Sequence, residues 1–148
     1  IKDIPHIFPL WRMLSDKHAE LEPMFKIVEN AENKFGGYLK TILVREDDTV
    51  FVAESNSKII GYAIASISTT PEVFVIRKRL YVQDMMVSPE YRKAGVGRKL
   101  MTSVMALAEE QQIEKIDLLV AVKNDGANKF WRAMGFNPAL NYMTKYLT

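Results

Sequence analysis

The chain has 148 residues, 48% of them hydrophobic and 26% charged, which is enough to bury a core, and we expect a single domain over residues 1–148. Its 20 basic residues nearly balance its 18 acidic ones, which argues against an electrostatic nucleic-acid binder. The absence of cysteine excludes disulfides, thiolate zinc sites and cysteine nucleophiles, and the two histidines cannot form a metal site by themselves. No apolar run reaches the roughly 20 residues of a membrane span, so we expect a soluble, cytoplasmic protein without a membrane partner.

Two helices are predicted in the first third of the chain. Asp3 followed by Pro5 indicates a helix start, and the helical pattern continues to about Leu21, before Pro23. The residues that share one face at helical spacing are Ile7, Leu10, Trp11, Leu14 and His18. A less regular helical pattern covers residues 28–43 and contains two adjacent glycines. Both helices should lie on one side of a sheet.

Three strands are predicted next. Residues 49–55 and 59–68 are rich in β-forming residues and flank a short polar turn, which predicts an antiparallel hairpin. Residues 79–87 are apolar on both faces, as in a central strand, except for Gln83 and Asp84. Because these two residues are adjacent, we expect them to point to opposite faces of the sheet.

The last third alternates helices and strands. The pattern predicts a helix from about residue 96 to 111, a strand over 115–122, a short helix ended by Gly135 and a last strand over 141–147. The order of elements predicts a mixed α/β fold. Since the chain begins with Ile1, we also expect that a first strand is missing.

Glycines and basic residues surround the expected start of the helix at residue 96. Gly95 and Gly97 would let the backbone approach a ligand, and the first N–H groups of the helix would face an anion. A P-loop is excluded by the spacing, and the dinucleotide motif needs a third glycine where Leu100 stands. The pattern therefore predicts a phosphate cradle; alternatively, the two glycines only shape a turn before a helix.

Three motifs resemble the GNAT superfamily of N-acetyltransferases. The sequence RKAGVG (residues 92–97) matches the Arg/Gln-x-x-Gly-x-Gly/Ala signature of that superfamily, and YVQDMMVSPEYR (81–92) resembles its fourth strand and the following turn. A later segment resembles Asn-x-x-Ala-x-x-Phe-Tyr-x-x-x-Gly-Phe, with Asn124, Ala127, Phe130, Gly135 and Phe136. The resemblance implies a mixed, mostly antiparallel sheet flanked by helices, with the first strand missing.

The resemblance also implies acetyl-CoA as the acetyl donor. The backbone of Met86 and Val87 would bind the pantetheine arm, in a slot where the fourth and fifth strands splay apart. Asn124 and Phe130 would lie on the cofactor side. The loop that would hold the pyrophosphate comprises Arg92, Lys93, Ala94, Gly95, Val96, Gly97, Arg98 and Lys99.

Two catalytic positions depart from the pattern of the superfamily. Many relatives have Glu-Asp where this chain has Gln83 and Asp84; Gln83 can hold a water, and Asp84 can act as the base or bind a cationic substrate, or else has a structural role. The usual tyrosine acid is replaced by Trp131, so another tyrosine, Tyr142 or Tyr62, takes the role, or the thiolate leaves unaided.

The sequence thus predicts an N-acetyltransferase that acetylates a primary amine of a small molecule or amino-acid-like substrate by direct attack on the thioester. Tyr81 and Glu20 are further candidates for the substrate side, although Glu20 can simply be a surface residue. The alternative is a non-catalytic acyl-CoA-binding regulatory domain. A homodimer is possible, and no nucleic-acid partner is expected.

Overall fold

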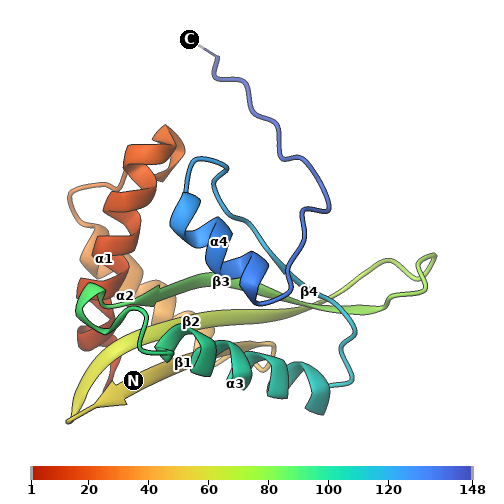
Figure 1. Cartoon of the computed structure of the whole chain (residues 1–148), viewed down its shortest axis with the longest axis horizontal. Helices are drawn as coiled ribbons and strands as arrows, with labels where there is room; N and C mark the ends of the chain where they lie inside the picture. The colour runs from red at the N-terminus through yellow and green to blue at the C-terminus, as the bar shows by residue number, and fades with distance from the viewer. Residues whose placement is uncertain (1, 148) are drawn as a thin grey trace.

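The computed structural model describes residues 2–147 and contains four strands with helices on both faces of the sheet (Figure 1). In chain order the elements are α1 (Ile4–Leu21), the 3-10 helix η1 (Pro23–Phe25), α2 (Ala31–Ile42), β1 (Asp48–Ser55), β2 (Lys58–Thr69), β3 (Lys78–Val87), the 3-10 helix η2 (Pro89–Tyr91), α3 (Val96–Glu110), β4 (Ile116–Leu118) and α4 (Asp125–Ala133). The mixed, mostly antiparallel sheet predicted from the sequence is confirmed.

The sheet has the strand order β1-β2-β3-β4. The first two pairings are antiparallel and run almost the full length of the strands, whereas β4 is parallel to β3. That parallel pairing covers only Leu80–Val82 of β3 against Ile116–Leu118 of β4. Because β3 continues to Val87, the two strands share a ladder at one end only, and the rest of β3 has no strand on that side among residues 2–147.

Each face of the sheet has its own hydrophobic core. One core joins α1 and α2 to the sheet and includes Leu39, Tyr62 and Ile64, and the other joins α3 to the sheet and includes Met101 and Val104. All five side chains are fully buried. Since α1 and α2 cover one face and α3 the other, a residue of the central strand β3 can reach either layer according to the direction of its side chain.

The two predicted front helices form as expected. Proline stands in the first turn of α1, where its missing N–H costs nothing. Trp11 of α1 stacks on Phe35 of α2, with ring centroids 4.2 Å apart, which fixes the two helices against each other. No helix within residues 2–147 has the length and apolar character needed to span a bilayer.

Two strand predictions are corrected by the structure. β4 covers three residues of the predicted strand over 115–122, because its pairing with β3 ends at Val82 and Leu118. The predicted last strand over 141–147 is absent: these residues form no strand and lie exposed, away from the sheet (Figure 1). Residues with a high β propensity, such as tyrosine and threonine, favour a strand, but a strand also needs a neighbour that supplies hydrogen bonds.

Candidate functional site

Gln83 and Asp84 lie at a bulge in β3. In the pairing with β2, Ile64 is opposite Asp84, but the next residue of β2, Ala65, is opposite Val82, so β3 has one extra residue here. As a result both side chains reach the face covered by α1 and α2: Gln83 contacts α2, and Asp84 lines a cavity beside α1. The prediction that they point to opposite faces is wrong, because regular alternation fails at a bulge.

A cavity of about 260 Å³ opens between α1, the segment after it and β3. Its walls combine apolar and aromatic side chains, such as Trp11, Leu14 and Phe25, with the polar side chains of His18 and Lys26. Asp84 supplies the only carboxylate among its lining residues. A carboxylate within an aromatic wall suits a cation that carries an apolar body.

Burial changes the acid–base behaviour of Asp84. Loss of solvation raises the pKa of its carboxyl from 3.8 to about 6, while a hydrogen-bonding contribution from Tyr62 lowers the pKa by a smaller amount. Tyr62 is fully buried, and burial next to Asp84 raises the pKa of its hydroxyl well above 10. The Tyr62 hydroxyl is close enough to Asp84 to affect it, yet it makes no hydrogen bond of normal geometry to any described residue. Asp84 therefore titrates just below neutral pH, in the range suited to a general base.

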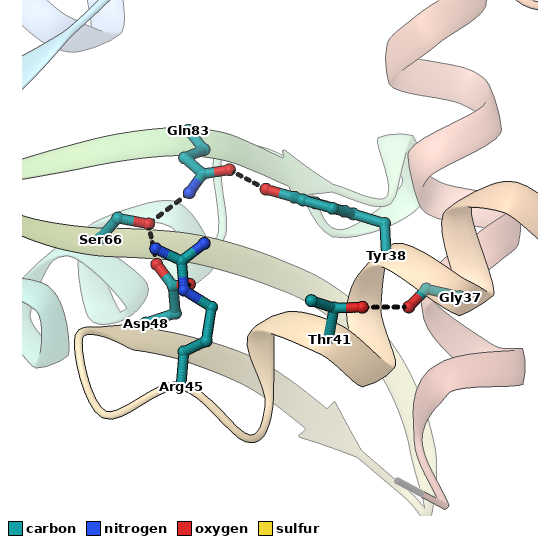
Figure 2. A network of polar contacts seen from close by, with 7 residues as sticks. All are labelled: Gly37, Tyr38, Thr41, Arg45, Asp48, Ser66 and Gln83. Atoms are coloured by element: carbon teal, nitrogen blue, oxygen red, sulfur yellow. Dashed lines mark hydrogen bonds and ion pairs between the residues drawn. The ribbon is translucent and has the colours of Figure 1, made fainter.

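The side chain of Gln83 is held by hydrogen bonds at both ends (Figure 2). Its carbonyl oxygen accepts from the Tyr38 hydroxyl, and its amide nitrogen donates to the Ser66 hydroxyl. Ser66 donates in turn to Asp48, which forms an ion pair with Arg45 at 3.1 Å. This chain of contacts joins α2, β3, β2 and β1, so Gln83 anchors the bulge to the α2 layer.

The glycine-rich loop leads into the start of α3. Gly95 is the residue before the first turn and has φ +82°, a conformation that favours glycine, and an added Cβ there would meet no atom within 4 Å. Gly97 is different, because a Cβ at this position would lie 3.2 Å from the ring of Phe130. Gly95 thus leaves open space at the positive end of the helix, while Gly97 lets α3 pack closely against α4.

Basic side chains surround this helix start. Lys93 also has a positive φ, and Lys93, Arg98 and Lys99 are solvent-accessible. Arg92 instead turns back toward β3, and its Nε donates to the carbonyl oxygen of Val87 at 3.2 Å, while its guanidinium lies 3.7 Å from the sulfur of Met86. The loop, together with Ala94 and Val96, thus lies next to the end of β3 and offers N–H groups and positive charge to an anion.

The remaining part of the cofactor motif forms α4. The Asn124 side chain accepts a hydrogen bond from the N–H of Ala127 at 3.2 Å, which caps the helix. Phe130 and Trp131 pack edge to face, with ring centroids 4.9 Å apart, and Trp131 packs in the same way on Phe136. Both aromatic residues also contact the core between the sheet and α3. Trp131, which stands at the position of the usual tyrosine acid, therefore has a packing role in this structure.

The other predicted site residues lie apart from the cavity. Tyr142 is exposed in the segment after α4, and Glu20 is exposed on α1, 3.4 Å from Lys17. Tyr81 is half-buried on β3, opposite Asp117 of β4. The predictions for these three side chains stay untested.

The walls of the cavity could not be recognised from the sequence. The helical spacing of Trp11, Leu14 and His18 predicts a core-facing stripe, which is the usual meaning of such a pattern. Phe25 in the following 3-10 helix gave no signal at all. Burial lowers the pKa of His18, so its imidazole is neutral near pH 7.

A model of the acetyltransferase (GNAT) family matches residues 10–136 of the chain. An uncharacterized N-acetyltransferase of Archaeoglobus fulgidus is 31% identical over 94 residues, which cover 64% of this chain and 63% of that protein. An uncharacterized N-acetyltransferase of Methanocaldococcus jannaschii is 27% identical over 99 residues, which cover 67% of this chain and 43% of that protein. The chain spans about half the length of the curated relatives it matches.

Solved structures share the fold. A mutant of the BH1408 protein of Bacillus halodurans superposes with a TM-score of 0.86 at 21% identity, covering 99% of this chain and 95% of that one. The aminoglycoside N-acetyltransferase AAC(6')-Iy in complex with CoA has a TM-score of 0.74 at 18% identity, covering 99% of this chain and 94% of that one. At these identities the likeness shows the fold alone.

Proposed function

The chain belongs to the acetyltransferase (GNAT) family, and from this premise we propose that it transfers the acetyl group of acetyl-CoA to a primary amine of a small molecule or amino-acid-like substrate. The observation that carries the proposal is the position of Asp84. Its carboxylate lines the aromatic-walled cavity at the bulge of β3, and this bulge lies just beyond Val82, where β3 loses its pairing with β4. The acceptor cavity and the donor slot would thus meet at one stretch of backbone.

The residues along this slot suit the acetyl donor. The β3 segment that ends at Met86 and Val87 would bind the pantetheine arm through its backbone, and the N–H groups at the start of α3 would bind the pyrophosphate. The open space at Gly95 and the accessible cations Lys93 and Arg98 support this assignment. Acetyl-CoA would supply the acetyl group as an activated thioester, and backbone N–H groups near Val87 would stabilise its oxyanion.

Asp84 would prepare the amine for attack. A primary amine with a pKa of about 10.4 is mostly protonated near pH 7, and removing its proton there costs about 4.6 kcal/mol. The carboxylate attracts the ammonium form into the cavity and takes its proton, directly or through a water molecule, so that the nitrogen lone pair is free to attack. With a pKa of about 6, Asp84 is ionised at neutral pH and can accept this proton.

Release of the thiol makes a smaller demand on the protein. A thiol with a pKa of about 8.5 leaves without full protonation, and it can take its proton from solvent. A tyrosine acid is therefore not required, which fits the packing role of Trp131. Correct placement of amine and thioester supplies a large part of the rate.

The proposal is tested by following thiol release from acetyl-CoA with a disulfide dye, in the presence of pooled polyamines, amino acids, aminoglycosides and short peptides. The chain has no cysteine, so the protein adds no background. Aminoglycosides are included because two of the proteins with this fold are aminoglycoside acetyltransferases. We expect amine-dependent release. Binding of coenzyme A without release for any pool would favour the regulatory acyl-CoA-binding alternative, and absence of binding would contradict both.

A further inference from the structure

The cavity beside Asp84 is lined by charges of both signs. Asp84 supplies a carboxylate from β3, and Lys26, the residue that follows η1, supplies an ammonium group. The backbone N–H of Lys26 donates to the carbonyl oxygen of Pro23 at 3.1 Å, which fixes the start of this segment at the end of η1. Since the two charges come from different elements around the cavity, a ligand inside it meets a negative group on the strand and a positive group on the opposite segment.

The ammonium group of Lys26 is available to a ligand. Lys26 is exposed, and it forms no ion pair with any residue in the described part of the chain. Asp84 is partly buried, and this burial raises the pKa of its carboxyl to about 6. The carboxylate therefore lies in the inner part of the cavity, and the ammonium group lies on the side of the solvent.

The remaining walls suit a small apolar body between the two charges. Trp11, Leu14 and Phe25 supply apolar surface, and the ring of His18 packs on that of Phe25 with centroids 5.1 Å apart. Because burial lowers its pKa, the imidazole of His18 is neutral near pH 7 and can donate one hydrogen bond. The volume of about 260 Å³ lies below the range of about 300–1,000 Å³ that is typical of sites for drug-sized ligands, so the cavity favours a small molecule.

We propose that the acetyl acceptor is an amino acid with an apolar body, which binds with its ammonium group at Asp84 and its carboxylate at Lys26. This inference rests on the proposed acetyl transfer and narrows the class of its acceptor. Polyamines and aminoglycosides carry several cationic groups and no carboxylate, so a second cation would lie beside Lys26 and be repelled. A simple alkylamine avoids this repulsion but leaves Lys26 without a partner. An amino acid pairs with both charges.

The reaction also favours release of such a product. The amine nitrogen loses a proton to Asp84 and attacks the thioester carbonyl, the new C–N bond replaces the C–S bond, and the thiolate leaves and takes a proton from solvent. The product is an N-acetyl amino acid, in which a neutral amide replaces the ammonium group. Its attraction to Asp84 is therefore lost, and the bond of its carboxylate to Lys26 remains.

The first test compares acceptors that differ only in the carboxylate, leucine against isoamylamine and ε-aminocaproate against pentylamine, by thiol release from acetyl-CoA. In the pair that is used better, we expect kcat/KM to be at least about tenfold higher for the amino acid. Lys26→Met should remove this preference by raising KM for the amino acid about 10- to 100-fold, with a smaller change in kcat. Lys40→Met is the matched control, because Lys40 is an exposed lysine of α2 that does not line the cavity, and it should keep the preference. A preference for the amines, or a preference that survives Lys26→Met, would overturn the inference and leave the proposed acetyl transfer standing.

The second test reverses the charge at the cavity. ε-Aminocaproate and cadaverine differ only in the group at one end, a carboxylate or an ammonium group. Lys26→Glu should therefore prefer cadaverine, whereas the parent protein should prefer ε-aminocaproate; an unchanged order would refute the role of Lys26. Calorimetry with the two amino acids and coenzyme A separates recognition from transfer. Binding that Lys26→Met weakens, without thiol release for any acceptor, would support the recognition of the amino acid and contradict the proposed transfer.

Discussion

Asp84 is the residue on which the proposed chemistry depends most. Replacing it with asparagine keeps its size but removes the base and the negative charge that would attract an ammonium group. For Asp84→Asn we expect kcat/KM for the best amine to fall by about 10²- to 10⁴-fold. The parent protein should lose activity as the pH falls through about 6, because protonation of Asp84 removes the base. The variant should show no such acid limb.

The measurement is thiol release from acetyl-CoA between pH 5 and 9 for both proteins. Asp16→Asn is the matched control. Asp16 is an exposed carboxylate on α1, paired with Arg12 at 3.1 Å, and its loss should leave the dependence of activity on pH unchanged. A full rate with Asp84→Asn, or an acid limb that survives the substitution, would exclude Asp84 as the base.

Gln83 shows why a glutamate cannot simply be restored at this position. The amide accepts from Tyr38 and donates to Ser66, which already uses its hydrogen in the bond to Asp48. A carboxylate could accept but not donate, and it would add a negative charge near Asp48. We therefore expect Gln83→Glu to lower the free energy of unfolding by about 1–3 kcal/mol and to give no gain in kcat.

Urea unfolding and the thiol-release assay measure these two effects on the same sample. The matched variant is Tyr38→Phe, which removes one bond of the same network without adding charge, and it should cost less stability than Gln83→Glu. If Gln83→Glu increases kcat and leaves stability unchanged, position 83 can hold a catalytic base, and Gln83 is not needed to anchor the bulge.

At the scale of the elements, the contact between α3 and α4 at Gly97 links the glycine-rich loop to the aromatic core. A side chain at this position must displace the Phe130 ring, which a Cβ would already approach to 3.2 Å. We expect Gly97→Leu to lower stability by about 1–3 kcal/mol and to weaken coenzyme A binding, since the start of α3 moves away from its position. Calorimetry with coenzyme A and thermal unfolding would measure both.

A control for this substitution is Gly126→Ala in the first turn of α4. A Cβ at Gly126 would meet nothing within 4 Å, and its φ is not in the left-handed region, so neither stability nor binding should fall. If Gly97→Leu leaves the affinity for coenzyme A unchanged, the loop at residues 92–99 does not bind the cofactor, and its assignment as the pyrophosphate site is contradicted.

The elements that sequence reasoning predicted well are those with local causes. The helical spacing that predicts α1 and the polar turn that predicts the β1–β2 hairpin each depend on residues close together in the chain. Both elements appear in the structure. The bulge at Gln83 was not predictable in this way, because it depends on the register with β2 and on Tyr38 in a distant helix. The cavity beside Asp84 was missed for the same reason: the residues of α1 in its wall have the spacing of an ordinary core stripe, and only the fold brings them next to Asp84.

At the scale of the whole molecule, Asp84 couples the proposed activity to folding stability. The pKa of its carboxyl is about 6 in the folded chain, against 3.8 for the ordinary group, because burial disfavours the charged form. Between these two values the folded state holds a proton that the unfolded state has already lost. The contribution of Asp84 to stability therefore falls as the pH rises through this window, and the full penalty, about 3 kcal/mol, remains above pH 6.

Asp84→Asn lacks this penalty, because an amide stays neutral at every pH. We expect the variant to match the parent protein near pH 4 and to be more stable by up to about 3 kcal/mol at pH 8, while it loses activity. Urea unfolding of both proteins at the two pH values gives the difference directly. A difference that does not grow with pH would mean that Asp84 is ionised at little cost in the folded chain. In that case the carboxylate would be a weaker base than proposed, and the placement of the amine would have to supply more of the rate.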